Sequence, residues 1–159
     1  MKIECATGLS VDVPAATLEG ARLDGLNLHR ALLVGAVLKR ATFHAANLRG
    51  AFISAADAEG ASFAGANVIT AFFEKSRLVN VSFKDADASS AQFNDADLTG
   101  ADLGGANIAF ASFRRARLCG ANMLSSRIED ADLIDAIYDD HTQWPGGFDP
   151  ESRGAIRTS

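Results

Sequence analysis

The fold of this chain is decided by a pattern that is clearest in residues 96–105, which read Ala96-Asp97-Leu98-Thr99-Gly100-Ala101-Asp102-Leu103-Gly104-Gly105. This stretch is the same five-residue unit written twice. Each unit starts with a small residue, carries a large apolar residue two positions later, and ends in glycine. Neither the period of a helix nor that of a coiled coil produces a strict repeat of five. A short repeat of fixed length instead predicts a solenoid, in which successive units stack on one another.

The same unit continues outward from this stretch through most of the chain. Alanine recurs at every fifth position from Ala16 to Ala136. The interruptions of that column are Leu26, Ser76, Val81 and Ser126. The apolar residue two positions later recurs from Leu18 to Leu133, and none of these positions is polar. A position that never holds a polar residue predicts a continuous buried column.

Alternation along an extended chain explains what each unit does. Residues two apart point to the same side of an extended segment, so the small and the large residue of a unit both face inward. The residue between them is mostly polar and points outward. The last two residues, which often end in glycine, turn a corner. Each unit is therefore one side of a coil, and coils must stack because one unit cannot bury its inner face alone.

A second, longer period indicates the number of sides in a coil. Phenylalanines stand twenty residues apart in two series, which are Phe43, Phe63, Phe83 and Phe73, Phe93, Phe113. Twenty residues are four units, and a three-sided coil would lose these ladders. The inward Ala58 and Ala88 compensate for the volume of the paired phenylalanines in their layers. We therefore expect an all-β fold, a quadrilateral β-helix of about six four-sided coils, roughly 30 Å long at the usual strand spacing.

The five-residue units resemble those of the pentapeptide-repeat family, and the resemblance covers about residues 16–138 without an insertion. It implies that the β-helix is right-handed. The segment Tyr138-Asp139-Asp140-His141-Thr142-Gln143-Trp144-Pro145-Gly146-Gly147-Phe148-Asp149-Pro150 also resembles the ending of many bacterial members. We expect three parts: an N-terminal entry segment at residues 1–15, the β-helix at residues 16–138, and a C-terminal cap and tail at residues 139–159.

The C-terminal segment has the residues of a cap. Bare coil ends expose unpaired strand edges, which invite aggregation unless something covers them. Trp144 and Phe148 offer large apolar faces that can cover the last coil. Asp149 followed by Pro150 suits the start of a short helix, which we expect to run through Arg153.

The N-terminal segment is expected to lead directly into the solenoid. Val11 and Val13 fall in the phases of the small and the large inward columns. This phase predicts that the chain enters as one irregular side, which ends at Pro14.

Composition and charge favour a cytoplasmic protein that does not bind nucleic acid directly. The 159 residues carry a formal net charge of −5, which disfavours a general nucleic-acid-binding surface. Cys5 and Cys119 lack the spacing of a metal or redox motif, which predicts unpaired thiols in a reducing compartment. The chain starts without the apolar run of a signal peptide, and no stretch has the length of a membrane-spanning helix.

The sequence offers little support for catalysis. It contains no phosphate loop, nucleophile elbow or dinucleotide fingerprint. His29 and His44 fall at turn positions on different sides of different coils. We interpret Asp139-Asp140-His141 as a polar turn into the cap, with a cation site as the alternative, and Cys119 as an outward thiol without an activating neighbour. We therefore expect no enzyme, no metal, no cofactor and no small-molecule substrate.

The family resemblance implies one specific function, DNA mimicry. Some pentapeptide-repeat proteins resemble duplex DNA and protect gyrase from quinolones. Asp57, Glu59 and Asp97 share one side and supply part of the acidic ladder that such a mimic needs. Arg77 and Arg117 interrupt the same outward column, and a capping tail replaces the bare terminal coil through which similar gyrase-protecting members dimerise. Gyrase binding is therefore kept as the alternative function.

The main functional prediction is a non-catalytic rod that binds a protein partner or a second copy of itself. The candidate interface consists of Leu32, Val34, Phe52, Ile69 and Phe72. Three of them stack in one outward column, where polar residues are usual, and the rings of Phe52 and Phe72 are expected about 5 Å apart. An apolar stripe on a solvent face usually marks an interface. The alternatives are cover by the N-terminal segment or surface phenylalanines without a role.

Overall fold

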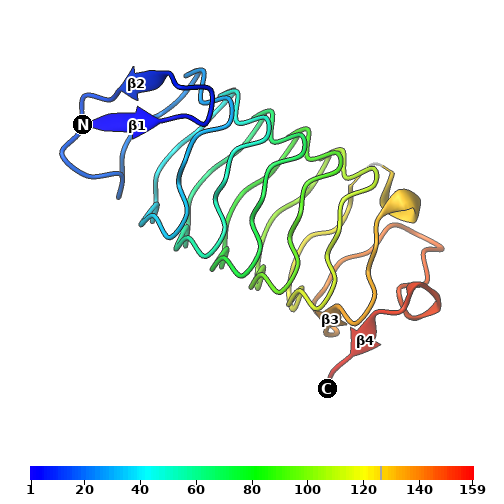
Figure 1. Ribbon diagram of the computed structural model, residues 1–159. Coiled ribbons are helices and arrows are strands. Elements are labelled where there is room, and N and C mark those ends of the chain that lie inside the picture. Colours follow the sequence, from blue (N-terminus) through cyan, green and yellow to red (C-terminus); the bar gives the residue numbers. More distant parts are fainter. Residues whose placement is uncertain (126) are drawn as a thin grey trace.

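The computed structural model describes residues 1–125 and 127–159 and shows a rod of stacked coils, with the two termini at opposite ends (Figure 1). Strands β1 (Lys2–Glu4) and β2 (Ser10–Asp12) lie at the N-terminal end of the rod. Strands β3 (Ile137–Tyr138) and β4 (Ile156–Arg157) lie at the C-terminal end. Two short 3-10 helices, η1 (Ile128–Asp130) and η2 (Glu151–Arg153), belong to the C-terminal part of the chain.

Single-residue parallel bridges join the coils along the body of the rod. Every single-residue parallel bridge with both residues between Arg22 and Ile137 joins positions that are twenty apart. Phe52 illustrates the pattern: its N–H donates to the Ala31 carbonyl at 2.9 Å, and its carbonyl accepts from the Leu33 N–H at 2.8 Å. This alternation is the hydrogen-bond pattern of parallel strands. The twenty-residue period that the phenylalanine spacing predicts is therefore confirmed.

The core of the rod is a set of inward columns. Every large inward residue from Leu18 to Leu133 is buried. Within each of the two phenylalanine series, neighbouring rings are stacked with centroids 4.6–5.1 Å apart. The two series meet edge to face at 5.3–5.5 Å, a favourable geometry for aromatic rings. Ala58 and Ala88 are fully buried in the same core, as the volume argument requires.

The last residue of a unit turns the corner with its backbone in the left-handed region. Gly100 has φ 67, and the non-glycine residues Arg30 and Thr70 both have φ 55. Glycine adopts this region freely, whereas other residues lose about 1–2 kcal/mol there. The frequent glycine at the fifth position of the unit follows from this geometry. Where another residue stands there, its side chain lies on an outer edge of the rod.

One interruption of the alanine column has a clear structural reason. Ser76 is buried, with 1% of its surface exposed. Its hydroxyl donates to the Ile53 carbonyl at 2.8 Å and accepts from the Ala56 N–H at 3.2 Å. A buried hydroxyl is tolerated when it is hydrogen-bonded in this way. Ser126, another interruption, lies outside the described residues.

The N-terminal segment folds differently from the single irregular side that the sequence predicts. β1 and β2 form an antiparallel hairpin, with Ile3 opposite Val11. Beyond β1, Cys5 forms an antiparallel bridge with Ala31 of the first coils. The prediction is wrong because the first regular side would otherwise leave N–H and carbonyl groups unpaired at its open edge. Glu4 and Ala6 form hydrogen bonds with that edge instead. Val13 is nevertheless buried, as its phase predicts.

The regular pattern also departs from the prediction near both ends of the solenoid. Ala16 is exposed, so the inward alanine column begins at Ala21. Near the C-terminal end, Arg127 has φ 61 and leads into the 3-10 helix η1. Ile128 nevertheless remains 4% exposed and keeps its place in the core. The inward apolar positions are thus kept even where the side of the coil is distorted.

The polar turn after β3 contains one extra residue. Gln143 bridges to Asn122, which is twenty-one positions earlier, whereas the regular spacing is twenty. Thr142 consequently takes the inward position, and its hydroxyl donates to the Leu118 carbonyl at 2.9 Å. Asp139 accepts hydrogen bonds from the Gly120 N–H at 2.9 Å and from a neighbouring N–H in its own turn. These bonds, led by the one from Gly120, lower the pKa of Asp139, and they agree with the interpretation of this segment as a turn.

The C-terminal tail packs against the end of the rod. Trp144 and Phe148 are partly buried against the core, and their stacked rings lie 5.5 Å apart. Asp149 accepts from the N–H groups of the first two residues of η2 at 3.1 and 3.3 Å, so the predicted short helix through Arg153 is confirmed as a single 3-10 turn. The sequence pattern does not predict the return of the chain as β4, which pairs in parallel with β3.

Candidate functional site

Four outward columns run along the rod, one for each side of the coil, and one of them starts with apolar residues. That column contains Leu32, Phe52 and Phe72, which are joined by parallel bridges, and it continues into Gln92. The structure therefore places Leu32, Phe52 and Phe72 on one face, as the sequence predicts. Outward positions elsewhere in the repeat are mostly polar. We use the term apolar stripe for Leu32, Val34, Phe52, Ile69 and Phe72.

The centre of the apolar stripe is a pair of stacked rings. The centroids of Phe52 and Phe72 lie 5.2 Å apart at an interplanar angle of 7°, close to the predicted separation. Both side chains are half-buried. Leu32 is 49% exposed and Val34 is 65% exposed. The outward orientation of these residues is confirmed, and their role as an interface stays a prediction.

The N-terminal hairpin leaves the Leu32 end of the apolar stripe uncovered. The Leu32 N–H donates to the Glu4 carbonyl at 2.7 Å, and the Ala6 N–H donates to the Arg30 carbonyl at 2.9 Å. The end of β1 and the residues that follow it therefore pair edge to edge with the side that carries Leu32. Leu32 and Val34 remain exposed. The sequence leaves open the alternative that the N-terminal segment covers the stripe. For Leu32 and Val34 that alternative is wrong.

A shallow groove runs along one edge of the apolar stripe. Its volume is about 310 Å³, and its lining residues are His29, Arg30, Arg49, Gly50, Phe52, Thr70 and Phe72. Val34 and Ile69 do not line this groove, although they belong to the stripe. The apolar pattern of the sequence does not connect Arg30 and Arg49 with the stripe. Their spacing from Gly50 and His29, twenty residues in each case, is the signal that could have placed them there.

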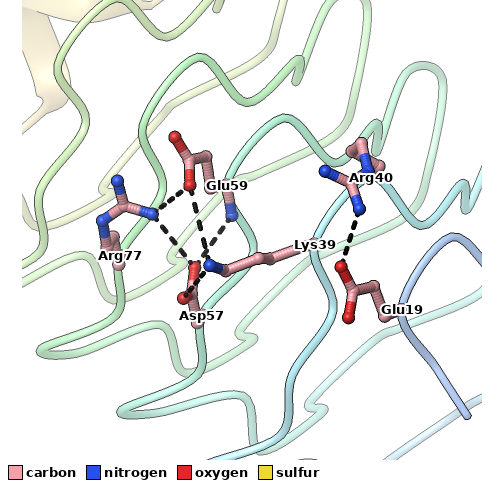
Figure 2. Close-up of polar contacts among 6 residues, drawn as sticks. All are labelled: Glu19, Lys39, Arg40, Asp57, Glu59 and Arg77. Atoms are coloured by element: carbon pink, nitrogen blue, oxygen red, sulfur yellow. Dashed lines mark hydrogen bonds and ion pairs between the residues drawn. The ribbon is translucent and has the colours of Figure 1, made fainter.

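The next face of the rod carries charged side chains. Asp57 and Arg77 lie in its outward column, and Lys39 and Glu59 lie at the corner that follows. We use the term charged face for these four residues. Lys39 and Arg77 lie on either side of Asp57 and Glu59 (Figure 2). The Lys39 Nζ is 3.2 Å from Asp57 and 3.9 Å from Glu59, and Arg77 pairs with both carboxylates. The hydrogen bond from Arg77 lowers the pKa of Glu59.

Ion pairing neutralises much of the acidic ladder that a DNA mimic would need. Besides the network of Asp57 and Glu59, Asp95 pairs with Arg115 at 2.7 Å. Near the N-terminal end, Arg40 pairs with Glu19 at 2.7 Å (Figure 2). These carboxylates are therefore engaged by cations of the same chain.

The residues weighed for chemistry do not converge. The His44 ring lies 2.8 Å from the Ser62 hydroxyl, whereas His29 lines the groove. Cys5 is buried, Cys119 is partly exposed, and both thiols are free. Within residues 1–125 and 127–159, no cluster of three or more His, Cys, Asp or Glu side chains could hold a metal ion. A separate search of the same residues finds no helix that is long and apolar enough to cross a membrane.

Comparisons with known proteins identify the family. Residues 15–50, 36–74, 71–105 and 96–137 match the family model described as pentapeptide repeats (8 copies). A search of curated proteins found no match. Among solved structures, a pentapeptide repeat protein from the Arabidopsis thaliana thylakoid lumen is 24% identical, over 80% of this chain and 72% of its own, with a TM-score of 0.43.

Two further solved structures show similar likeness. A pentapeptide repeat protein from Nostoc Pcc 7120 is 27% identical, over 61% of this chain and 84% of its own, with a TM-score of 0.35. QnrB1, a plasmid-mediated fluoroquinolone resistance protein, is 14% identical, over 93% of this chain and 88% of its own, with a TM-score of 0.47. The family model covers well over half of the sequence. The chain therefore belongs to the pentapeptide repeat family, whose members imply a right-handed β-helix.

Proposed function

We propose that this protein is a rigid, non-catalytic interaction rod that binds a protein partner, or a second copy of itself, through the apolar stripe. In this proposal residues 16–138 form a right-handed quadrilateral β-helix of about six four-sided coils, and residues 1–15 and 139–159 close its two ends. Pentapeptide repeat proteins are generally non-catalytic structural or interaction proteins. The observation that carries the proposal is the stacked, outward-facing pair of Phe52 and Phe72.

Exposed apolar area and a rigid backbone together favour an interface on this face. Leu32 and Val34 leave about half or more of their surface in water, and the two phenylalanines beside them are only half-buried. Covering this surface with a partner removes apolar area from water, which is the main driving force of association. The backbone beneath is already held by hydrogen bonds between coils, so little conformational entropy is lost on binding.

The alternative function, gyrase binding by DNA mimicry, has weaker support. Asp57 and Glu59 on the charged face are paired with Lys39 and Arg77, and Asp95 is paired with Arg115. A mimic needs carboxylates that are available to the basic groove of the enzyme. A gyrase supercoiling assay in the presence of the purified protein separates the two functions. The interaction-rod proposal predicts unchanged supercoiling, and inhibition or protection from a quinolone would favour mimicry.

We also propose a cytoplasmic location, on the basis of the two free thiols at Cys5 and Cys119. The Arabidopsis relative, by contrast, comes from the thylakoid lumen. Labelling of Cys119 by a thiol reagent in intact cells, compared with purified protein, tests this part of the proposal. A cysteine that is already oxidised in cells would contradict it.

The interface is tested by placing a charge at the centre of the apolar stripe. Phe72→Asp should abolish the specific retention of a partner from an extract of the source cell, and any self-association measured by sedimentation. Gln92→Asp is the matched control, because Gln92 lies in the same outward column one coil further along. Both variants should stay folded by circular dichroism. Retention of every association by folded Phe72→Asp would refute the proposal.

A further inference from the structure

The groove beside the apolar stripe brings unpaired cations next to the stacked rings. Arg30, Gly50 and Thr70 follow one another at twenty-residue spacing along one corner of the rod, and His29 and Arg49 do so beside them. Gly50 leaves room at that corner: the Arg30 Cγ lies 3.4 Å from the point where a Cβ on Gly50 would stand. The Arg30 side chain can therefore lie over Gly50, alongside Phe52.

These two arginines are not neutralised by the chain itself. Within the described ranges, neither Arg30 nor Arg49 forms an ion pair, although the protein as a whole has a net charge of −5. Arg77 and Arg115, on other parts of the rod, are both paired with carboxylates. The edge of the stripe formed by Arg30 and Arg49 thus offers guanidinium groups to an external anion.

The opposite edge of the apolar stripe differs in charge. Glu74 lies in the same coil as Phe72, two residues further along the chain, and its carboxylate accepts a hydrogen bond from the Ser54 hydroxyl at 2.7 Å. The stripe is therefore basic along the Arg30 edge, whereas Glu74 and the neighbouring Lys75 place both signs of charge at the other edge. A bound segment with its own acidic groups is favoured on the arginine side.

The orientation of the Phe52 and Phe72 rings also favours a partner with acidic groups. Because Phe52 and Phe72 are stacked, each turns one face toward the other, and Leu32 and Gln92 are the next residues of the column on either side. The ring edges carry the positive part of the aromatic quadrupole, which favours carboxylate and carbonyl oxygens. Single-stranded nucleic acids bind instead by stacking bases on ring faces.

We propose that this groove binds an extended acidic segment of a partner protein. Its apolar side chains would lie on Phe52 and Phe72, and its carboxylates would pair with Arg30 and Arg49. The inference rests on the proposed function, since it uses the apolar stripe as the interface, and it adds the charge of the partner. Charge complementarity of this kind contributes mainly to selectivity and to the rate of association.

The test uses three fluorescein-labelled synthetic peptides of equal length, in which phenylalanine alternates with aspartate, with serine or with lysine. A labelled oligothymidylate serves as a probe for nucleic acid. Binding is measured by fluorescence anisotropy for the native protein and for three variants. Phe72→Ser removes the ring, and Arg30→Gln with Arg49→Gln removes the groove charges. Lys84→Gln with Arg117→Gln is the control, because it makes the same charge change at residues outside the groove and without ion pairs in the described part of the chain.

The aspartate peptide should bind the native protein at least about tenfold more tightly than the lysine peptide, and about 0.5 M salt should reduce this ratio. The Arg30 and Arg49 variant should lose about fivefold or more for the aspartate peptide, whereas the Lys84 and Arg117 variant should bind within about twofold of native. Phe72→Ser should weaken all three peptides.

The other outcomes would contradict either the acidic-partner inference or the interface proposal. Equal binding of the three peptides, still lost in Phe72→Ser, would overturn the acidic-partner inference and leave the interface proposal standing. Binding of the aspartate peptide that is unaffected by Phe72→Ser would count against the interface itself. Preferred binding of the oligothymidylate would replace the protein partner with a nucleic acid. Failure of every peptide to bind the folded native protein would overturn the inference.

Discussion

The apolar stripe and the charged face next to it are built on the same backbone. The Phe72 N–H donates to the Ala51 carbonyl at 2.9 Å, and five residues later the Arg77 N–H donates to the Ala56 carbonyl at the same distance. On one face the outward column stacks two aromatic rings, and on the other it forms an ion-pair network. The inward residues therefore specify the rod. The outward residues are free to vary, so evidence about function is best sought there.

If the inward residues specify the rod, substitutions at inward positions should have the largest effect on stability. Ala58 is fully buried in the layer that also holds Phe63 and Phe73. Ala58→Leu should lower the free energy of unfolding by about 1–3 kcal/mol, because the close-packed core has no room for the larger side chain. Urea denaturation measures the change. Ala64→Leu, at an outer position of the same side as Phe63, should change stability little, and equal effects of the two variants would mean that the inward assignment is wrong.

A smaller effect is expected when the aromatic stack of the apolar stripe is removed. Phe72→Ser replaces the ring by a residue that already occupies the same column at Ser112. Loss of the stack on Phe52 should lower the free energy of unfolding by about 1 kcal/mol, the usual contribution of an aromatic pair. The measurement is again urea denaturation. Unfolding of this variant at room temperature would show that Phe72 belongs to the core and not to an outer surface.

The charged face should contribute less to stability than the apolar stripe does. Arg77 bonds both Asp57 and Glu59, yet all three side chains are partly exposed and screened by water. Arg77→Ala should therefore lower the melting temperature less than Phe72→Ser does, and salt should reduce the difference from native further. Differential scanning calorimetry at low and high salt checks both statements. A larger loss for Arg77→Ala would reverse the comparison of the two faces.

The smallest expected effect is the acid dependence of the charged face. The hydrogen bond from Arg77 lowers the pKa of Glu59 below its ordinary value of about 4.3. A carboxyl group with a lowered folded-state pKa stabilises the protein above its ordinary pKa, and this contribution disappears as the pH falls through the lowered value. The melting temperatures of native protein and Arg77→Ala should therefore converge on acidification below about pH 4. A gap that widens in acid would contradict this sign.

The body of the solenoid could be predicted from the sequence because one repeat controls it. The twenty-residue spacing of Phe43 and Phe63 sets the register, and the register then places Phe52 on Phe72. No sequence period reports the antiparallel pairing of Cys5 with Ala31, because it joins a non-repeating segment to a repeating one. The sequence pattern likewise does not reveal the extra residue before Gln143, which changes the bridge spacing from twenty to twenty-one positions.

The candidate site could be predicted only in part, for a related reason. The outward column of Leu32, Phe52 and Phe72 follows directly from the repeat. The groove depends on how the side chains of Arg30 and Arg49 lie at a corner, and on the room that Gly50 leaves. Corner residues vary from unit to unit, so a pattern of fives predicts where they lie along the rod but not which of them meet.

The most direct test of the central claim compares one charge substitution on each face in a single assay. Sedimentation velocity is run on native protein, Phe72→Asp and Arg77→Asp, each alone and mixed with the protein that the native chain retains from cell extract. Phe72→Asp should lose association while its circular dichroism spectrum stays native, and Arg77→Asp should associate as native does. Association that survives Phe72→Asp but is lost in folded Arg77→Asp would move the interface to the charged face and contradict the account.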